Sequence, residues 1–233
     1  ISENKNIYES AINDAFLDEY FKEKNKKSNI DITGRNLIIK EVIEKYVKQI
    51  LDIDKFYSPF RIISLEKHYT AYLPVIINNK PVKVRIGGII DRIDEKDGKI
   101  RIIDYKTGAS ENSFKSIDSL FDEKGSKRNS AVFQTLMYSL IFSYNNRKSD
   151  IIPSLYFIRE SFGKDFDYRI IYNKGRKNAH PVNSFGILSE EYSNRLQQTL
   201  EDLYNDNKEF TQTDDLEVCK FCPYTGICHK EGV

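Results

Sequence analysis

The sequence predicts an α/β fold in which helices flank a mixed central β-sheet and a Cys-rich tail follows. Three observations support this. Two β-rich runs, 82–93 and 99–105, flank a short polar turn. Residues 131–145 have the apolar spacing of a helix, and the strongly apolar run 151–159 is typical of a central strand. We expect a mostly helical N-terminal part at 1–55.

Length and the first residue suggest how the chain is organised. At 233 residues, one domain spanning 1–233 is the simplest count. We expect a core at 60–185 and a C-terminal helix with a Cys motif at 189–233. Because the sequence begins with Ile, we expect a fragment of a longer chain.

Composition excludes several classes of protein. The net charge is +1, so any nucleic-acid surface must be a local basic patch. The sequence has no run of 18 apolar residues and no visible signal peptide, which argues against a membrane or secreted protein. Its three cysteines all fall within residues 219–228, a spacing typical of metal ligands in a reducing compartment, so we expect a cytoplasmic protein.

The stretch 82–108 carries the chemistry. We expect a β-hairpin whose turn is Glu95-Lys96-Asp97-Gly98, with Asp94 pairing with Lys99. Alternation along the strands then places Asp91, Asp104 and Lys106 on one face. In this register Asp91 is a diagonal neighbour of Asp104, at roughly 7–8 Å between backbones.

Two carboxylates and a lysine at a strand end are costly to bury unless something compensates them. A divalent cation would compensate Asp91 and Asp104, and hard oxygen ligands suit magnesium or manganese. Such an ion can activate water, while Lys106 can hold that water or the developing oxyanion. This group of residues therefore predicts hydrolysis of a phosphodiester.

Three motifs resemble one known family. The run Gly88–Asp94 followed by Asp104–Gly108 resembles the RecB/AddB-type exonuclease branch of the PD-(D/E)XK nuclease superfamily. Gln134 and Tyr138 match its Q-x-x-x-Y helix, and the three cysteines partly match its C-terminal iron–sulfur motif. The resemblance covers about residues 62–229, and the motifs occur in the family's order.

The resemblance implies a restriction-endonuclease-like fold and a role for each motif residue. Asp91, Asp104 and the backbone carbonyl of Tyr105 would bind the metal ion, and Lys106 would be catalytic. Gln134 would order the site as a further catalytic residue. Tyr138, on the same helical face one turn later, would contact the nucleic acid.

The resemblance also implies a biological role. It implies a DNA exonuclease that acts on single-stranded or duplex ends, either within a helicase–nuclease of recombinational DNA repair or as a free-standing exonuclease like the CRISPR-associated members of the clan. The partner would be a helicase domain or subunit, because this sequence has no Walker A motif. The alternative is a catalytically inactive module of the same fold that binds DNA or a partner protein; relatives of that kind lack the acidic pair or the lysine, whereas all three residues are present here.

The cysteines leave three alternatives open. In the family, such a run joins a distant upstream Cys to hold a [4Fe–4S] cluster, which takes four ligands. Cys219, Cys222 and Cys228 supply three, so the fourth would lie outside this sequence. A zinc ion held by the three Cys and His229 is the second alternative, and free thiols are the third.

The remaining expectations concern scaffold and substrate contacts. We expect helices at 4–24 and 37–54 and a strand at 60–74. Residues 151–159 and 166–172 are expected to form two further strands. Ser189 is expected to cap the last long helix. The polar stretch 107–130 follows the metal-binding strand and is expected to be irregular, to border the substrate groove and to contact phosphates through Lys127 and Arg128. Glu66 resembles a Glu that precedes the Asp motif in many relatives, and we interpret it as structural or as an outer-shell partner.

Overall fold

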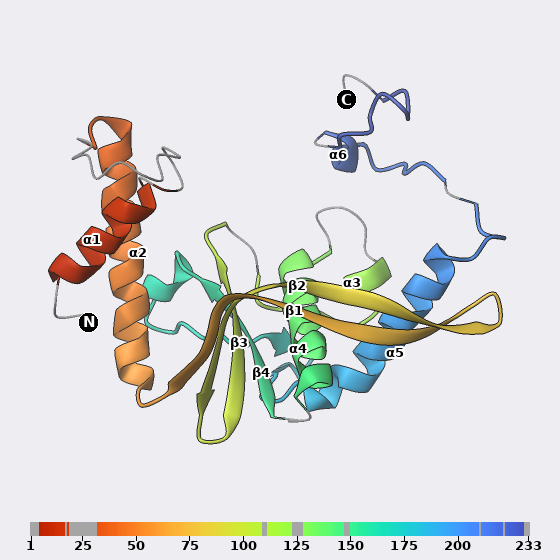
Figure 1. Ribbon diagram of the computed structural model, residues 1–233, viewed down its shortest axis with the longest axis horizontal. Helices are drawn as coiled ribbons and strands as arrows, with labels where there is room; N and C mark the ends of the chain where they lie inside the picture. Colours follow the sequence, from red (N-terminus) through yellow and green to blue (C-terminus); the bar gives the residue numbers. More distant parts are fainter. Residues whose placement is uncertain are drawn as a thin grey trace. The chain divides into compact units, whose positions relative to one another are not determined.

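The structure is a computed structural model that describes residues 5–16, 18, 32–108, 111–122, 128–146, 150–209, 211–220 and 222–230 (Figure 1). Internal contacts divide the chain into two compact units. The first comprises residues 1–60 and 157–167, and the second comprises residues 61–156 and 168–233.

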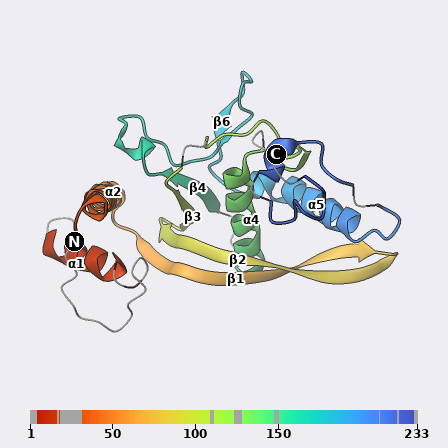
Figure 2. The same ribbon diagram turned by 90° about the horizontal axis from the view of Figure 1, so that it is seen from above.

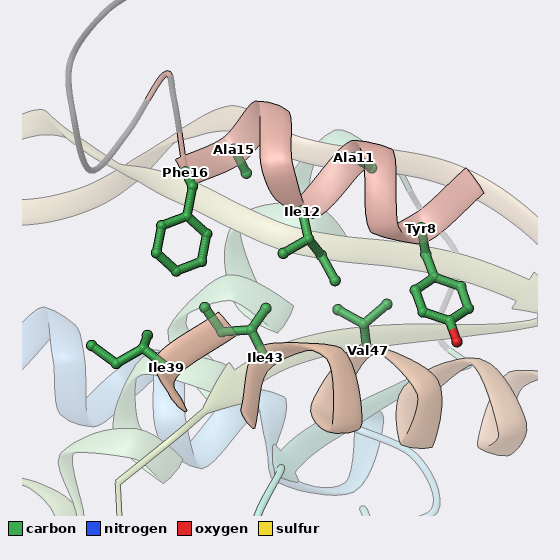
Figure 3. Close-up of a pocket in the computed structure, with 8 residues that line it drawn as sticks. All are labelled: Tyr8, Ala11, Ile12, Ala15, Phe16, Ile39, Ile43 and Val47. Carbon is green, nitrogen blue, oxygen red and sulfur yellow. The ribbon is translucent and has the colours of Figure 1, made fainter. Parts of the chain in front are cut away.

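The first unit is built on two helices, α1 (Lys5–Ala15) and α2 (Arg35–Tyr57), with a short 3-10 turn, η3 (Glu160–Phe162). Apolar side chains at helical spacing line a pocket of about 480 Å³ between α1 and α2 (Figure 3): Tyr8, Ala11, Ile12, Ala15, Phe16, Ile39, Ile43 and Val47. The helix expected at 37–54 is confirmed as α2, and the part of the expected helix 4–24 beyond Asp18 lies outside the described residues. The two helices contact each other.

The second unit contains a four-stranded mixed sheet in the order β1-β2-β3-β4. Its strands are β1 (Arg61–Ile77), β2 (Lys80–Lys96), β3 (Lys99–Lys106) and β4 (Ile151–Phe157). β1 pairs antiparallel with β2, and β2 pairs antiparallel with β3. The expected strand at 60–74 is thus confirmed and extends to Ile77.

Helix α4 (Ser130–Asn145) connects β3 to β4 and packs against β1, β2 and β3. Helix α5 (Gly186–Leu203) packs against β1 and α4, and both helices lie on the same side of the β1–β2 hairpin (Figure 2). The core lies between these helices and the sheet. It includes Ile93 and Ile102, which pair across β2 and β3 and are fully buried. The expected helix 131–145 is confirmed, and its apolar face fastens α4 to the sheet.

The turn between β2 and β3 differs from the expectation. Lys96 pairs with Lys99, so only Asp97 and Gly98 form the turn, and the expected four-residue turn is wrong. Both residues have positive φ, 52° and 77°. Such a two-residue turn has the twist of the flanking strands, and Asp-Gly is one of its preferred sequences.

The shorter turn moves the register by two residues. Asp94 pairs with Arg101 and not with Lys99. Because side chains alternate with a period of two, this shift preserves the face on which each side chain lies. The last pair is Arg92 with Ile103, and the next position in the same register places Asp91 directly opposite Asp104 rather than diagonal to it.

Strand β4 is wholly buried, yet it is last in the sheet order, so the expected central position is wrong. A neighbouring segment covers it, since Leu155 N–H donates to the Tyr168 carbonyl at 2.8 Å and Ser154 forms a bridge with Arg169. The apolar run therefore indicates burial and not a central place in the sheet.

Two other expectations are corrected. Of the strand expected at 166–172, only β5 (Ile171–Tyr172) is a strand, and it pairs with β6 (His180–Pro181). Helix α5 begins at Gly186, so Ser189 lies within it and its hydroxyl donates to the Gly186 carbonyl at 3.0 Å. The N–H of Gly186, the first residue of α5, donates instead to Ser184 Oγ at 3.3 Å.

The polar stretch 107–130 is less irregular than expected, because it contains the short helix α3 (Ser119–Asp122). Among the described residues, no helix is both long enough and apolar enough to cross a membrane.

We expect Gly98→Ala to lower the free energy of unfolding by about 1–2 kcal/mol, because φ of 77° is unfavourable for a residue with a Cβ. Urea denaturation would measure this. The matched control is Gly108→Ala, where φ lies outside the left-handed region and an added Cβ would meet no atom within 4 Å. The control should leave the stability unchanged or raise it by up to about 1 kcal/mol. Equal losses in both variants would contradict the assigned turn.

Candidate active site

The acidic side chains meet where the pairing of β2 with β3 ends. The last backbone pair is Arg92 with Ile103, and beyond it a hydrogen bond to the side chain of Asp91 joins the two strands. The Asp91 carboxylate accepts the backbone N–H of Tyr105 at 2.9 Å. Asp91, which is half-buried, is thereby held beside the strand that carries Asp104 and Lys106.

Asp104 is buried, with 2% of its surface exposed. Its Oδ2 atom lies 2.6 Å from Lys106 Nζ. Apart from that ion-pair contact, Oδ2 has no hydrogen-bond partner in the part of the chain that the structure describes. Burial raises the pKa of Asp104 above its ordinary value, Lys106 opposes this, and the charge of Asp91 adds to it. A buried carboxylate of this kind is suited to a cation.

Helix α4 brings two further side chains to this place. Lys106 Nζ donates to Gln134 Oε1 at 2.9 Å, and Gln134 Nε2 donates to Tyr138 Oη at 2.7 Å. Gln134 and Tyr138 are four residues apart and therefore lie on one face of the helix. The structure thus links Asp104, Lys106, Gln134 and Tyr138 in one polar chain.

Gly88 explains how the ring of Tyr138 comes so close to β2. A Cβ at residue 88 would lie 2.7 Å from Cε1 of Tyr138, closer than real contacts allow. Burial raises the pKa of Tyr138, so its hydroxyl is neutral at physiological pH. A neutral hydroxyl that already accepts from Gln134 retains its own proton for donation.

The donor set fits a divalent cation. Asp91, Asp104 and the Tyr105 carbonyl are oxygen donors, which magnesium and manganese prefer. Within the described ranges, no group of three or more His, Cys, Asp or Glu could hold a metal ion. A centre with two carboxylates and a backbone carbonyl is not such a group, because its third donor is not a side chain.

The remaining expected contacts lie around this centre. Arg128 is exposed next to Asn129, whose side chain caps α4 by accepting Val132 N–H at 3.1 Å. Lys127 lies outside the described residues. Glu66 is exposed, has φ of 46°, and lies in register opposite Asp91, between the pairs Leu65–Arg92 and Lys67–Ile90.

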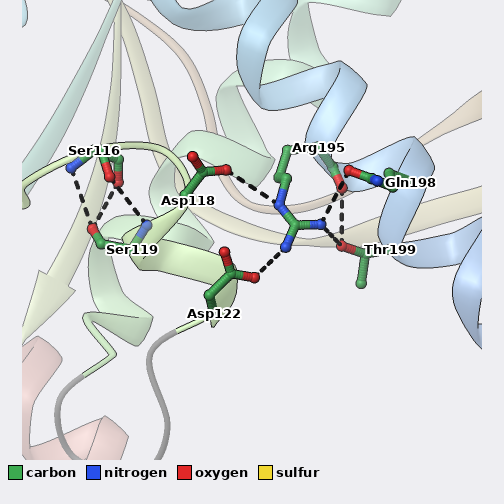
Figure 4. Close-up of polar contacts among 7 residues, drawn as sticks. All are labelled: Ser116, Asp118, Ser119, Asp122, Arg195, Gln198 and Thr199. Atoms are coloured by element: carbon green, nitrogen blue, oxygen red, sulfur yellow. Dashed lines mark hydrogen bonds and ion pairs between the residues drawn. The ribbon is translucent and has the colours of Figure 1, made fainter.

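The sequence did not predict the ion pairs that hold the segment after β3 in place. Arg195 of α5 forms ion pairs with Asp118, at 3.4 Å, and with Asp122, which lies in α3 (Figure 4). Its guanidinium also lies 5.3 Å from the ring centroid of Phe121. Residues 118–122 are thereby fixed to α5, and only the fold brings these side chains together.

The cysteine motif is described in part. Cys219 is buried, Cys222 and Cys228 are half-buried, and none is in a disulfide. Together with His229 they do not form a metal-holding group among the residues that the structure covers. The cluster therefore stays a prediction.

The comparisons with known proteins agree with this geometry. The family model of the PD-(D/E)XK nuclease superfamily matches residues 3–229, and the chain belongs to this superfamily. Its mixed sheet flanked by helices is the restriction-endonuclease-like fold. A search of curated proteins finds no match.

We expect Asp104→Asn to make the metal-free protein more stable at neutral pH. Because the folded-state pKa of Asp104 is raised, its stabilising contribution is fully present below the ordinary value of 3.8 and is lost as pH rises through the folded pKa. Asn does not titrate, so the stability difference between variant and wild type should grow as pH rises from 3.8. Urea denaturation in chelator, over a pH series, would measure it.

The control is Glu111→Gln, because Lys174 lowers the pKa of exposed Glu111. Its contribution is present above the ordinary value of 4.5 and is lost as pH falls through the folded pKa, so its pH dependence has the opposite sign. An Asp104→Asn protein that is less stable than wild type at neutral pH in chelator would contradict the raised pKa of Asp104.

Proposed function

We propose that this protein is a metal-dependent deoxyribonuclease that hydrolyses phosphodiester bonds. The observation that carries the proposal is the convergence of Asp91, Asp104 and Lys106 at one strand end, in a member of a nuclease superfamily. The alternative of an inactive binding module is less favoured, because such a module needs neither the acidic pair nor the lysine.

Asp91, Asp104 and the Tyr105 carbonyl would hold magnesium or manganese. A bound ion of this kind lowers the pKa of water and neutralises charge on a phosphate. The protein's part is to hold its carboxylates ready: Tyr105 N–H orients Asp91, and Lys106 neutralises Asp104.

Lys106 has one proton to offer to substrate or water. Its ammonium group has three donors, of which Asp104 and Gln134 take two. The third is available to orient the attacking water or to stabilise the developing oxyanion. Gln134 acts by fixing this geometry, since its carbonyl holds Lys106 and its amide holds Tyr138. The hydroxyl proton of Tyr138 is available for a hydrogen bond to a phosphate oxygen or to a nucleobase.

The more specific role rests on the resemblance of the motifs. We propose an exonuclease that acts on single-stranded or duplex DNA ends, with Lys127 and Arg128 contacting phosphates. A helicase domain or subunit in DNA repair would supply the ends. We also propose that the protein acts in the cytoplasm, from its cysteine usage.

We expect Lys106→Ala to lower the rate of metal-dependent DNA cleavage by about 100- to 1000-fold, because it removes a charged donor from the reacting phosphate. Linear single- and double-stranded DNA with magnesium or manganese would be the substrates. A covalently closed circle tests exonuclease action, since it offers no ends. The matched control is Lys99→Ala, an exposed lysine at the other end of the same strand.

Cleavage that Lys106→Ala abolishes and Lys99→Ala retains would support the proposal. Equal cleavage by both variants would reject the role of Lys106. Intact DNA binding without cleavage by the wild-type chain would favour the binding module, and cleavage of the closed circle would replace the exonuclease by an endonuclease.

We propose that Cys219, Cys222 and Cys228 hold a [4Fe–4S] cluster whose fourth ligand comes from outside this sequence, with zinc as the alternative. Cys222 N–H donates to the Cys219 carbonyl at 3.1 Å, which keeps these two residues close together, and Cys228 N–H donates to the Tyr224 carbonyl at 3.3 Å.

We expect protein purified without oxygen to be brown and to contain iron and sulfide, and Cys222→Ser to lose both. Iron, sulfide and zinc analysis with a visible spectrum would measure this. Zinc without iron would assign the alternative, and the absence of all three would leave free thiols.

A further inference from the structure

A buried group of charged side chains lies on the face of the β2–β3 hairpin that is opposite to Asp104 and Lys106. Asp94 and Arg101 pair across the strands and are both fully buried, and Arg92 is 3% exposed. Since side chains alternate along β3, the side chains of Arg101 and Tyr105 share this face, whereas those of Asp104 and Lys106 lie on the other.

One carboxylate binds two guanidinium groups. Arg101 donates through Nε to Asp94 Oδ1 at 2.9 Å and through Nη2 to Oδ2 at 2.8 Å, a bidentate pair. Arg92 donates through Nε to Asp94 Oδ2 at 3.0 Å. Asp94 therefore fixes the orientation of both arginines.

Each arginine binds a tyrosine with its remaining donors. Arg101 donates to the Tyr156 hydroxyl at 2.9 Å, and Arg92 donates to the Tyr105 hydroxyl at 3.1 Å. The rings of Tyr105 and Tyr156 contact each other edge to face, with centroids 5.5 Å apart. Each side of the network thus contains the same kind of hydrogen bond, from an arginine to a tyrosine hydroxyl.

Tyr105 belongs both to this network and to the candidate metal centre. Its side chain accepts from Arg92, while its backbone N–H donates to Asp91 at 2.9 Å. Its neighbours in the chain are Asp104 and Lys106. Fixing the Tyr105 ring therefore restrains the two peptide groups on either side of this residue. One of them contains the Tyr105 carbonyl, and the other joins Tyr105 to Asp104.

Stability alone does not account for three buried charges. Removing them from water is costly, and apolar side chains of similar volume are often at least as stabilising. Directional hydrogen bonds, in contrast, fix an orientation that apolar packing leaves less determined. The network orients Tyr105, and this is the property that a metal centre on the adjoining backbone requires.

We propose that Arg92, oriented by Asp94, is a positioning residue for the metal centre and acts through the Tyr105 hydroxyl. This inference rests on the proposed function, because it assumes that Asp91, Asp104 and the Tyr105 carbonyl bind a divalent cation. Neither Arg92 nor Asp94 touches the reacting atoms; they determine where the donors stand.

The experiment compares Tyr105→Phe with Tyr156→Phe. Each variant removes one tyrosine hydroxyl that accepts from a buried arginine and keeps the ring. Tyr156 is fully buried and Tyr105 is half-buried, so Tyr156→Phe is the more demanding control for a loss of stability. The unfolding midpoint should fall by about 2–4 °C in both. The decisive readout is the dissociation constant for Mn²⁺, measured by calorimetry without DNA.

We expect Tyr105→Phe to raise the Mn²⁺ dissociation constant by about 10-fold, as for other residues that orient metal ligands, and Tyr156→Phe to leave it within about 2-fold. Arg92→Met should weaken Mn²⁺ binding as Tyr105→Phe does, and the double variant should bind no more weakly than either single variant. In cleavage assays, kcat should fall in Tyr105→Phe with KM for DNA unchanged.

Equal Mn²⁺ affinities of Tyr105→Phe and Tyr156→Phe would overturn the inference and leave the network a purely structural element. A wild-type chain that binds no Mn²⁺ would also overturn it. A wild-type chain that binds Mn²⁺ and does not cleave DNA would reject the proposed nuclease activity, and the Mn²⁺ affinities of the two variants would still decide the inference.

Discussion

The pairing of β2 with β3 is the constraint on which the candidate site depends. The two-residue turn at Asp97-Gly98 fixes that pairing, because its twist matches that of the strands. A slip by one residue would move Asp91 to the opposite face from Asp104 and would remove one of the two carboxylates from the centre. The register also places Asp94 opposite Arg101, so one turn sets the geometry of both polar groups.

The hairpin carries charge on both faces, and each face compensates it differently. On one face Asp104 lies beside Lys106 with a remaining acceptor, and its burial raises its pKa in the metal-free protein although Lys106 opposes the rise. On the other face both oxygens of Asp94 accept hydrogen bonds from buried arginines, Oδ1 from Arg101 and Oδ2 from Arg92 and Arg101. A saturated group gives rigidity, whereas an unsaturated group gives a place for a ligand. The pairing of these two properties on adjoining backbone is what a preformed catalytic centre needs.

The helices complete the centre from the other side. α4 packs on β1, β2 and β3 and delivers Gln134 to Lys106, while the missing side chain of Gly88 lets Tyr138 approach β2. α5 packs behind α4 and, through Arg195, holds the segment that contains α3. The candidate centre is therefore supported by contacts between residues that lie far apart in the sequence.

The sequence by itself determined the helix that carries Gln134 and Tyr138 and the common face of Asp91 and Asp104, because these depend on local periods of two and 3.6 residues. The motif residues were indicated by the resemblance to the nuclease superfamily. The predicted face was correct despite the wrong turn length only because the register error was two residues, an even number. Tertiary structure alone decided the place of β4 in the sheet, the short β5, the Arg195 anchor and the Arg92–Asp94–Arg101 network. Each of these depends on which distant side chains compensate a buried charge or cover a strand edge, and periodicity along the chain contains no information about that choice.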